Sequence, residues 1–284
     1  MKRNIVIQRL IEGKTVFSTL PITNGDISTL SAVAQSSFEM AIVEMEHQGF
    51  DFPALRNSLQ HLMSRRRVIA SGSVIDPAPF VRIPASAREQ NQWIIKQTLD
   101  SGAMGLIVPH FDTVEGAEAT VRAARYPQER GSARSQPEGL RGWGPFTAAD
   151  YWGLSLTEYY DCADLWPLNP DGEILLMGIC ETVAGVRALP DILKRVKGIG
   201  AIWAGQGDLS VSMGLRGDSA HPDVEKEVHN ILKICQDHGV ACATAVTRAG
   251  DVLARVEQGF DIVLLPTPVS FEHLNRGMQK VGRA

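Results

Sequence analysis

The segment that decides the fold is "EILLMGICETVAGVRALPDILKRVKGIGAIWAG", Glu173 to Gly205. Two short apolar runs, typical of buried strands, flank a stretch whose apolar residues recur with the period of an amphipathic helix. A strand, a helix and a second strand in this order form a βαβ unit, in which the two strands are parallel. The segment therefore predicts a parallel sheet covered by helices.

The same alternation extends over nearly all of the 284 residues. Eight strand-like runs, most of them followed by a helix-like segment, favour a (β/α)8 TIM barrel with one domain over residues 1–284, rather than an open doubly wound sheet. The helix-like segments include residues 52–66 and 248–259. The strands are predicted at residues 15–22, 40–46, 78–84, 104–110, 173–181, 199–205, 240–246 and 261–267.

One region, residues 127–172, interrupts this rhythm. It is rich in glycine, proline, charge and aromatic residues. A connection this long within a compact domain is usually functional or disordered, and the aromatic residues argue against disorder. We expect an ordered excursion over the barrel mouth, with a short helix near residues 148–163.

Composition excludes several classes of protein. The net charge of −4 gives no basic field for nucleic acid, and no apolar run approaches the length of a membrane span. The four cysteines form no CxxC pair, which indicates a reducing compartment without a disulfide framework. We therefore expect a cytoplasmic protein without nucleic-acid or membrane partners.

Polar residues gather where the predicted strands end. They are Glu46, His47, Arg82, His110, Glu181 and residues 206–208. In a barrel these positions meet at the C-terminal face, where active sites lie, whereas an open sheet would scatter them along an edge.

Glu181 and Asp208 end two consecutive strands, so their carboxylates are expected to be neighbours. Such oxygen ligands suit Mg²⁺ or Mn²⁺, which retain waters and take further ligands from substrate. Alternatively, each carboxylate caps the helix that follows it. The spacing does not decide between these two interpretations.

Three further features of the strand ends each have a functional and a structural interpretation. Gly205 and Gly207, in "WAGQGD", expose backbone N–H groups that could bind an anion or form a plain turn. Arg82 could hold a substrate carboxylate or enolate oxygen, pair with a strand-end carboxylate, or do both. His47 could be a general base or a structural residue. No lysine falls on a predicted strand, which counts against Schiff-base chemistry.

Eight motifs in series resemble the metal-dependent pyruvate aldolases of the HpcH/HpaI family. The resemblance covers roughly residues 15 to 270. The motifs are "EMEHQGFD", "FVRIP", "LDSGAMGLIVP", "AARYP", "LRGWG", "ICETVAGV", "WAGQGDLSVSMG" and "HPDV".

The resemblance implies a (β/α)8 barrel that stabilises a pyruvate enolate with a divalent metal (Mg²⁺, Mn²⁺ or Co²⁺). By similarity, Glu181 and Asp208 are the metal ligands and Arg82 stabilises the enolate oxygen. The backbone amides of Gly205, Gln206 and Gly207 hold the substrate carboxylate. His47 is the catalytic histidine, paired with Asp100 of a neighbouring subunit. A homo-oligomer (trimer or hexamer) with an exchanged C-terminal helix is expected.

Two departures from the family pattern bear on specificity. Ile179 replaces a glutamine that is common two residues before the metal-binding glutamate, and "QERGSARSQPE", residues 128–138, lengthens a connection. The leading hypothesis is a carbon–carbon lyase that splits a 4-hydroxy-2-oxo acid into pyruvate and an aldehyde. The alternatives are an oxaloacetate decarboxylase or macrophomate synthase-like enzyme that uses the same enolate, and a non-catalytic barrel that binds a small acid.

Overall fold

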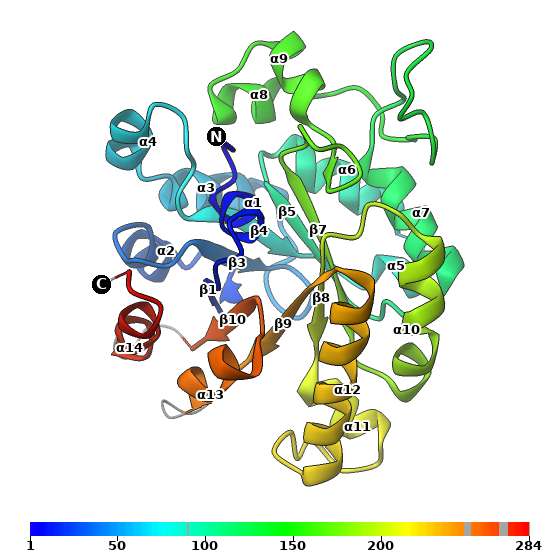
Figure 1. Cartoon of the computed structure of the whole chain (residues 1–284). Coiled ribbons are helices and arrows are strands. Elements are labelled where there is room, and N and C mark those ends of the chain that lie inside the picture. Colours follow the sequence, from blue (N-terminus) through cyan, green and yellow to red (C-terminus); the bar gives the residue numbers. More distant parts are fainter. Residues whose placement is uncertain (90, 247–250, 267–271, 284) are drawn as a thin grey trace. The chain divides into compact units, whose positions relative to one another are not determined.

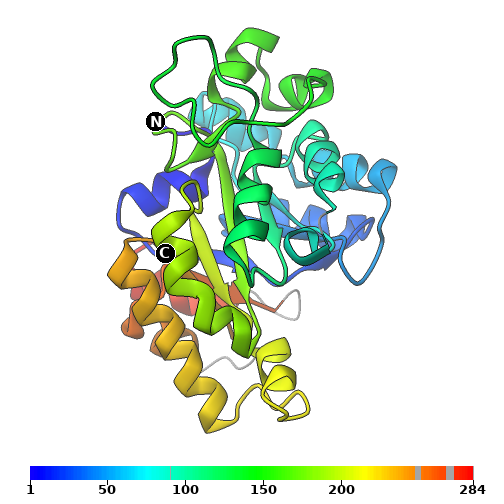
Figure 2. The same ribbon diagram turned by 90° about the vertical axis from the view of Figure 1, so that its right-hand side faces the viewer.

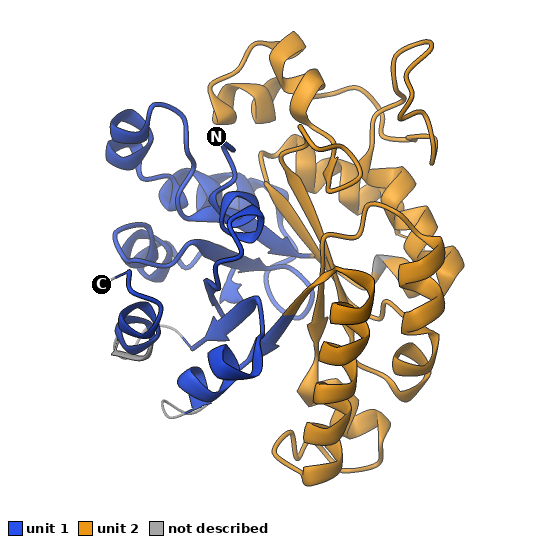
Figure 3. Ribbon diagram, viewed as in Figure 1, with its two compact units in different colours: residues 1–82, 243–284 blue, residues 83–242 orange. Residues whose placement is uncertain are grey.

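The computed structural model describes residues 1–89, 91–246, 251–266 and 272–283. Residues 248–250 of one predicted helix and Thr267 of the last predicted strand lie outside the described residues. The chain forms two compact units: unit 1 comprises residues 1–82 and 243–284, and unit 2 comprises residues 83–242 (Figure 3). That all 284 residues form one domain stays a prediction.

Unit 1 contains parallel strands that pair side by side (Figure 1). β3 pairs with β1, β2 and β4, β10 pairs with β1, and the residues of β9 that belong to this unit pair with β10. Apart from the two-residue β2, they match predicted strands. Their bounds are β1 Val16–Thr19, β2 Ile22–Thr23, β3 Met40–Glu44, β4 Ala78–Arg82, β9 Ala241–Ala245 and β10 Ile262–Leu265.

Helices α2 and α3 of unit 1 begin at aspartate caps. Asp26 and Asp51 accept hydrogen bonds from backbone N–H groups in the first turns of α2 and α3. The predicted C-terminal boundary of the helix over 52–66 is wrong. The helix ends at Leu62, Met63 has an extended backbone, and a separate helix begins at Arg65. The helices are α1 Ile5–Ile11, α2 Ile27–Ala34, α3 Phe52–Leu62, α4 Arg65–Ser71, α13 Asp251–Gln258 and α14 Glu272–Lys280.

Unit 2 has parallel strands in the order β5, β7, β8, with β6 beside β7. All seven residues of β7 are buried, which explains its continuous apolar sequence. Helices α10 and α12 pack side by side (Figure 2). The strands are β5 Gly105–Val108, β6 Leu165–Trp166, β7 Ile174–Cys180 and β8 Ala201–Ala204. The helices are α5 Ser86–Glu89, α6 Gln92–Asp100, α7 Val114–Ala124, α8 Phe146–Trp152, α9 Leu156–Cys162, α10 Val183–Arg195, α11 Gln206–Ser212 and α12 Pro222–His238.

The 127–172 insertion is ordered, as predicted. It forms two helices, α8 and α9, instead of one, and it does not lie over the carboxyl ends of the strands. Trp152 Nε1 donates to the carbonyl of Gly102 at 2.9 Å, just before β5, and β6 pairs with the first residues of β7. The insertion therefore lies at the amino ends of these strands, away from α11 (Figure 1). The prediction that it covers the mouth is wrong, because α7 carries the chain back from the carboxyl end of β5 before the insertion begins.

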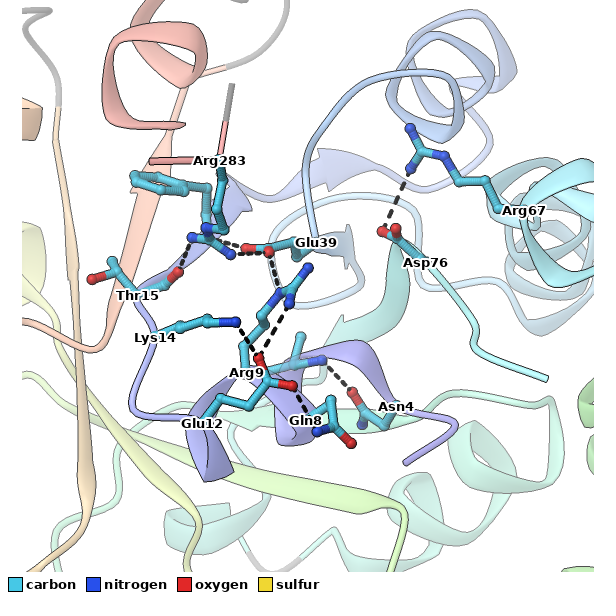
Figure 4. Close-up of polar contacts among 12 residues, drawn as sticks. Asn4, Gln8, Arg9, Glu12, Lys14, Thr15, Glu39, Arg67, Asp76 and Arg283 are labelled. Carbon is cyan, nitrogen blue, oxygen red and sulfur yellow. Dashed lines mark hydrogen bonds and ion pairs between the residues drawn. The ribbon is translucent and has the colours of Figure 1, made fainter. Parts of the chain in front are cut away.

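A buried polar cluster lies at the amino ends of the unit 1 strands (Figure 4). Glu39, which is 3% exposed, accepts hydrogen bonds from Arg9 Nε at 2.7 Å, from the backbone N–H of Phe17 at 3.1 Å and from Arg283. Arg283 also donates to the carbonyl of Thr15. The cluster ties the residues after α14 to the starts of β1 and β3 within this chain; helix exchange between subunits stays a prediction.

Asp76 in the same region gives a pH-dependent prediction. Burial raises the pKa of its carboxyl to about 6, although Arg67 at 3.5 Å opposes the shift. The folded chain binds this proton more tightly than the unfolded chain, so the stabilisation is present below about pH 4 and is lost as pH rises through 6. Between pH 4.5 and 7, Asp76→Asn should therefore gain about 1–2 kcal/mol in unfolding free energy relative to the native chain.

Urea unfolding of both proteins at several pH values measures this difference. Asp150→Asn, at an exposed aspartate, is the control and should follow the native chain. Parallel pH profiles for the native chain and Asp76→Asn would contradict the assignment.

Candidate active site

Glu181 stands directly after β7 with only 5% of its surface exposed. Its Oε1 accepts the backbone N–H of His110 at 2.6 Å. A Cβ at Gly205 would lie 2.8 Å from the Cβ of Glu181 and 3.2 Å from Oε2, so this position requires glycine. Glu181 does not cap α10, because Thr182 is the N-cap and accepts the N–H of Gly185 at 2.8 Å. The capping interpretation of Glu181 is therefore wrong.

Asp208 lies in the first turn of α11, which begins directly after Gly205. The carboxylate is exposed and lies at the positive end of a short helix, where negative charge is favoured. Gly205 is the N-cap of α11, and Gln206 and Gly207 are the first two residues of this helix. Both the helix-terminus and the metal-ligand interpretations remain compatible with the position of Asp208.

His110 lies beside Glu181. The sequence predicts it among the polar residues at the strand ends but predicts no role for it. Its Nδ1 lies 3.7 Å from Glu181 Oε1 and 4.0 Å from Asp112 Oδ2. Burial lowers the pKa of the imidazole, Arg88 lowers it further, and the charges of Asp112 and Asp208 oppose the shift. Its position at the end of a predicted strand places it at this face, but its contact with Glu181 could not be predicted from one sequence.

In unit 1, Glu44 at the end of β3 organises the following turn. Its Oε1 accepts the backbone N–H groups of Glu46 at 2.6 Å and His47 at 3.0 Å. Its Oε2 accepts Arg82 Nε at 2.7 Å and a second guanidinium N–H of the same residue. Arg82 thus makes the predicted salt bridge to a strand-end carboxylate, and Glu44 fixes its orientation.

His47 and Glu46 follow Glu44 in this turn, and they differ in exposure. The imidazole is 61% exposed, and its Nε2 lies 3.3 Å from Glu46 Oε2. The same Glu46 oxygen is 3.3 Å from Arg82 Nε. Glu46, His47 and Arg82 therefore form one polar cluster in unit 1, while His110, Glu181 and Asp112 lie close together in unit 2.

Asp100 is the last residue of α6, before β5, and is bound within its own chain. Arg141, whose side chain is fully buried, donates to Asp100 Oδ1 through Nη2 at 2.7 Å and to the hydroxyl of Tyr159 at 3.0 Å. Burial raises the pKa of Asp100, and the charge of Arg141 opposes the shift. Pairing of Asp100 with His47 of a neighbouring subunit stays a prediction.

The carboxylates of Glu181 and Asp208 are donors of the type that hard divalent cations bind. Among the described residues, no group of three or more histidine, cysteine or acidic side chains forms a closed metal site. Glu181 and Asp208 instead offer two carboxylates, and Mg²⁺ is commonly held by one or two carboxylates together with substrate oxygens and water. A closed zinc site, in contrast, would need more side-chain ligands.

Comparison with known proteins identifies the class of the chain. The family described as HpcH/HpaI aldolase/citrate lyase matches residues 25–266, and the chain belongs to this family. It is therefore an enzyme of the aldolase and lyase type. A crystal structure of a family member from Burkholderia cenocepacia superposes with a TM-score of 0.77 at 24% identity, covering 99% of this chain and 98% of that chain. This likeness confirms the (β/α)8 barrel.

Two relatives with named activities are similar over most of the chain. A hydroxypyruvate/pyruvate aldolase of Roseobacter denitrificans is 27% identical, covering 94% of this chain and 92% of the relative. A 4-hydroxy-2-oxovalerate aldolase of Rhodococcus jostii is 29% identical, covering 82% of this chain and 77% of the relative.

Proposed function

We propose that this enzyme reversibly cleaves a 4-hydroxy-2-oxo acid into an aldehyde and a small 2-oxo acid such as pyruvate or hydroxypyruvate. The observation that carries the proposal is the buried carboxylate of Glu181 at the carboxyl end of β7, with Asp208 at the start of α11. The names of the two relatives support this class of substrate. The alternative is an oxaloacetate decarboxylase or macrophomate synthase-like enzyme that uses the same enolate, and the assay below tests it through the release of CO₂ from oxaloacetate.

Glu181 and Asp208 are proposed to hold a divalent cation, Mg²⁺, Mn²⁺ or Co²⁺. When bound, such a cation acts as a Lewis acid for the negative charge that develops on the keto oxygen as the C3–C4 bond breaks. The N–H of His110 and the contact with Gly205 keep the Glu181 carboxylate in one orientation.

Arg82 is proposed to donate to the developing enolate oxygen. Its side chain is 17% exposed, and Glu44 holds it from the other side, so little reorganisation accompanies substrate binding. The backbone around Gly205, Gln206 and Gly207 is proposed to bind the substrate carboxylate, because it lies at the positive end of α11, where anions are favoured. The N–H of Gly205 itself donates to the carbonyl of Cys180 at 3.0 Å, so the helix residues Gln206 and Gly207 would carry this role.

His47 is proposed to remove the C4 hydroxyl proton, acting through water, and to return it in the aldol direction. Its exposed imidazole and its contact with Glu46 suit this role. Asp100 of a neighbouring subunit is proposed to complete the pair, which requires a homo-oligomer such as a trimer or hexamer. A cytoplasmic location is proposed because none of the four cysteines (Cys162, Cys180, Cys235 and Cys242) is joined in a disulfide.

The metal requirement gives the direct test. Treatment with EDTA should lower the release of pyruvate from a 4-hydroxy-2-oxo acid by at least about 100-fold, because a Lewis acid contributes several kcal/mol at the transition state. Added Mg²⁺, Mn²⁺ or Co²⁺ should restore the activity.

The alternatives give different results in the same assay. Faster release of CO₂ from oxaloacetate than of aldehyde from any 4-hydroxy-2-oxo acid would favour a decarboxylase. Binding of a small acid without turnover under all three metals would indicate a binding protein. Full activity in EDTA would exclude the metal.

Among the described residues, none of the helices combines the length and apolar character that a membrane crossing needs.

A further inference from the structure

His110 has a backbone conformation that side chains rarely adopt. Its φ of 51° lies in the left-handed region, which among the described non-glycine residues only Arg216 shares, with φ 54°. Such conformations cost free energy and are typical of functional sites, where the surrounding structure holds them in place.

The contacts around His110 explain what holds this turn. The N–H of His110 bonds to Glu181, and the N–H of Phe111 donates to the carbonyl of Ile179 at 3.1 Å. The ring of Phe111 fills the space beside Gly178, where a Cβ would lie 2.5 Å from it. The chain after β5 is therefore fixed along the end of β7, and the imidazole is fixed beside Glu181.

The Nδ1 atom of the imidazole is buried, and none of the described residues forms a hydrogen bond with it. The oxygens of Glu181 and Asp112 lie beyond hydrogen-bond distance, at 3.7 and 4.0 Å. The side chain is 19% exposed, so an edge of the ring away from Nδ1 is accessible. Buried polar atoms without a partner are uncommon in folded proteins, and those that occur at functional sites commonly bind a ligand, an ion or water.

Ile179, at the end of β7, provides no polar side chain near Glu181. It is 1% exposed and apolar, so it offers no hydrogen bond from its side chain. His110, which adjoins it across the Phe111 hydrogen bond, supplies a polar group there instead.

We propose that the imidazole of His110 hydrogen-bonds a hydroxyl group on the carbon next to the keto group of the 2-oxo acid. The enzyme would then favour hydroxypyruvate over pyruvate as the donor in the aldol direction. This inference rests on the proposed function, which puts the keto oxygen of the acid near Glu181 and so brings the neighbouring carbon toward the imidazole beside Glu181.

The test compares binding of the two acids. His110→Gly removes the ring but keeps the left-handed backbone and the N–H that bonds to Glu181. Isothermal titration calorimetry gives the dissociation constants of Mn²⁺ alone, and of pyruvate and hydroxypyruvate on the Mn²⁺-loaded protein. Loss of one hydrogen bond should raise the constant for hydroxypyruvate about 3–10-fold and leave the other two within about twofold.

Arg216→Gly is the matched control, since it relieves the same backbone conformation at an exposed residue and should change none of the constants. His110→Asn, which tolerates left-handed backbone and keeps a polar side chain, should recover part of the preference for hydroxypyruvate.

Equal weakening of both acids would overturn the inference, as would a parallel loss of Mn²⁺ affinity, because the ring would then act on Glu181 rather than on the hydroxyl. If the native protein binds both acids but cleaves no 4-hydroxy-2-oxo acid, the proposed function fails while the binding comparison still decides the role of His110. If it binds neither acid, both proposals fail.

Discussion

Glu181→Gln is expected to lower kcat/KM for aldol cleavage by about 1000-fold or more without disturbing the fold. The amide oxygen can still accept the N–H of His110, so the local structure is kept. What is lost is the negative charge proposed to hold the cation, and the loss of about 4 kcal/mol of transition-state stabilisation corresponds to this factor. Steady-state kinetics and Mn²⁺ titration of the purified variant measure the two effects.

Glu173→Gln is the matched control. Glu173 precedes β7, whereas Glu181 follows it, and the two residues are similarly buried, at 6% and 5% exposed. If both variants remain folded at the assay temperature, the Glu173 variant should keep its Mn²⁺ affinity and its turnover. A Glu181→Gln protein with native turnover would refute the proposed mechanism.

Arg82→Lys is expected to reduce kcat by about 100–1000-fold, the loss typical when a preorganised donor to a developing oxyanion is removed. Lysine keeps the positive charge beside buried Glu44, so the unfolding free energy should fall by only about 1 kcal/mol. It lacks the planar fork that reaches both Glu44 and a substrate oxygen. Kinetics and urea unfolding on the same preparation measure both quantities.

Arg82→Met separates the two roles of this side chain. It leaves the Glu44 carboxylate, 5% exposed, without its cation, and should lower the unfolding free energy by about 3–5 kcal/mol. Arg67→Lys, at a more exposed ion pair with Asp76, is the control and should change neither quantity appreciably. If kcat of Arg82→Lys falls only as far as its lower unfolding free energy leaves protein unfolded in the assay, Arg82 has a structural role alone.

The strands could be predicted from the sequence because burial on both faces demands continuous apolar runs. The run before Glu181 and the run before Gly205 each correspond to an observed strand, β7 and β8. Helix boundaries were harder: residues 52–66 read as one amphipathic segment, but the chain turns at Met63 because local backbone geometry is not encoded in hydrophobic periodicity.

The positions of the candidate site residues followed from the strand ends, whereas their partners did not. The partners of Glu44 could not be predicted from alternation along the strand, because β3 ends at Glu44 and the chain then bends. The Glu44 carboxylate accepts hydrogen bonds from Arg82 and from two backbone N–H groups of the following turn. Likewise, the pairing of Asp100 with Arg141 joins residues far apart in sequence. Such contacts depend on three-dimensional packing that one sequence does not reveal.

The location of the 127–172 insertion changes where substrate preference should be sought in this chain. Because α8 and α9 lie at the amino ends of β5 and β7, the added length of residues 128–138 is remote, within unit 2, from Glu181 at the other end of β7. Mutant libraries that aim at a new aldehyde or acid should vary the turns after β5, β7 and β8. Arg141 and Tyr159 of the insertion hold Asp100, the residue proposed for a neighbouring subunit's site, so a grafted peptide or reporter belongs in residues 128–138 rather than in α8 or α9.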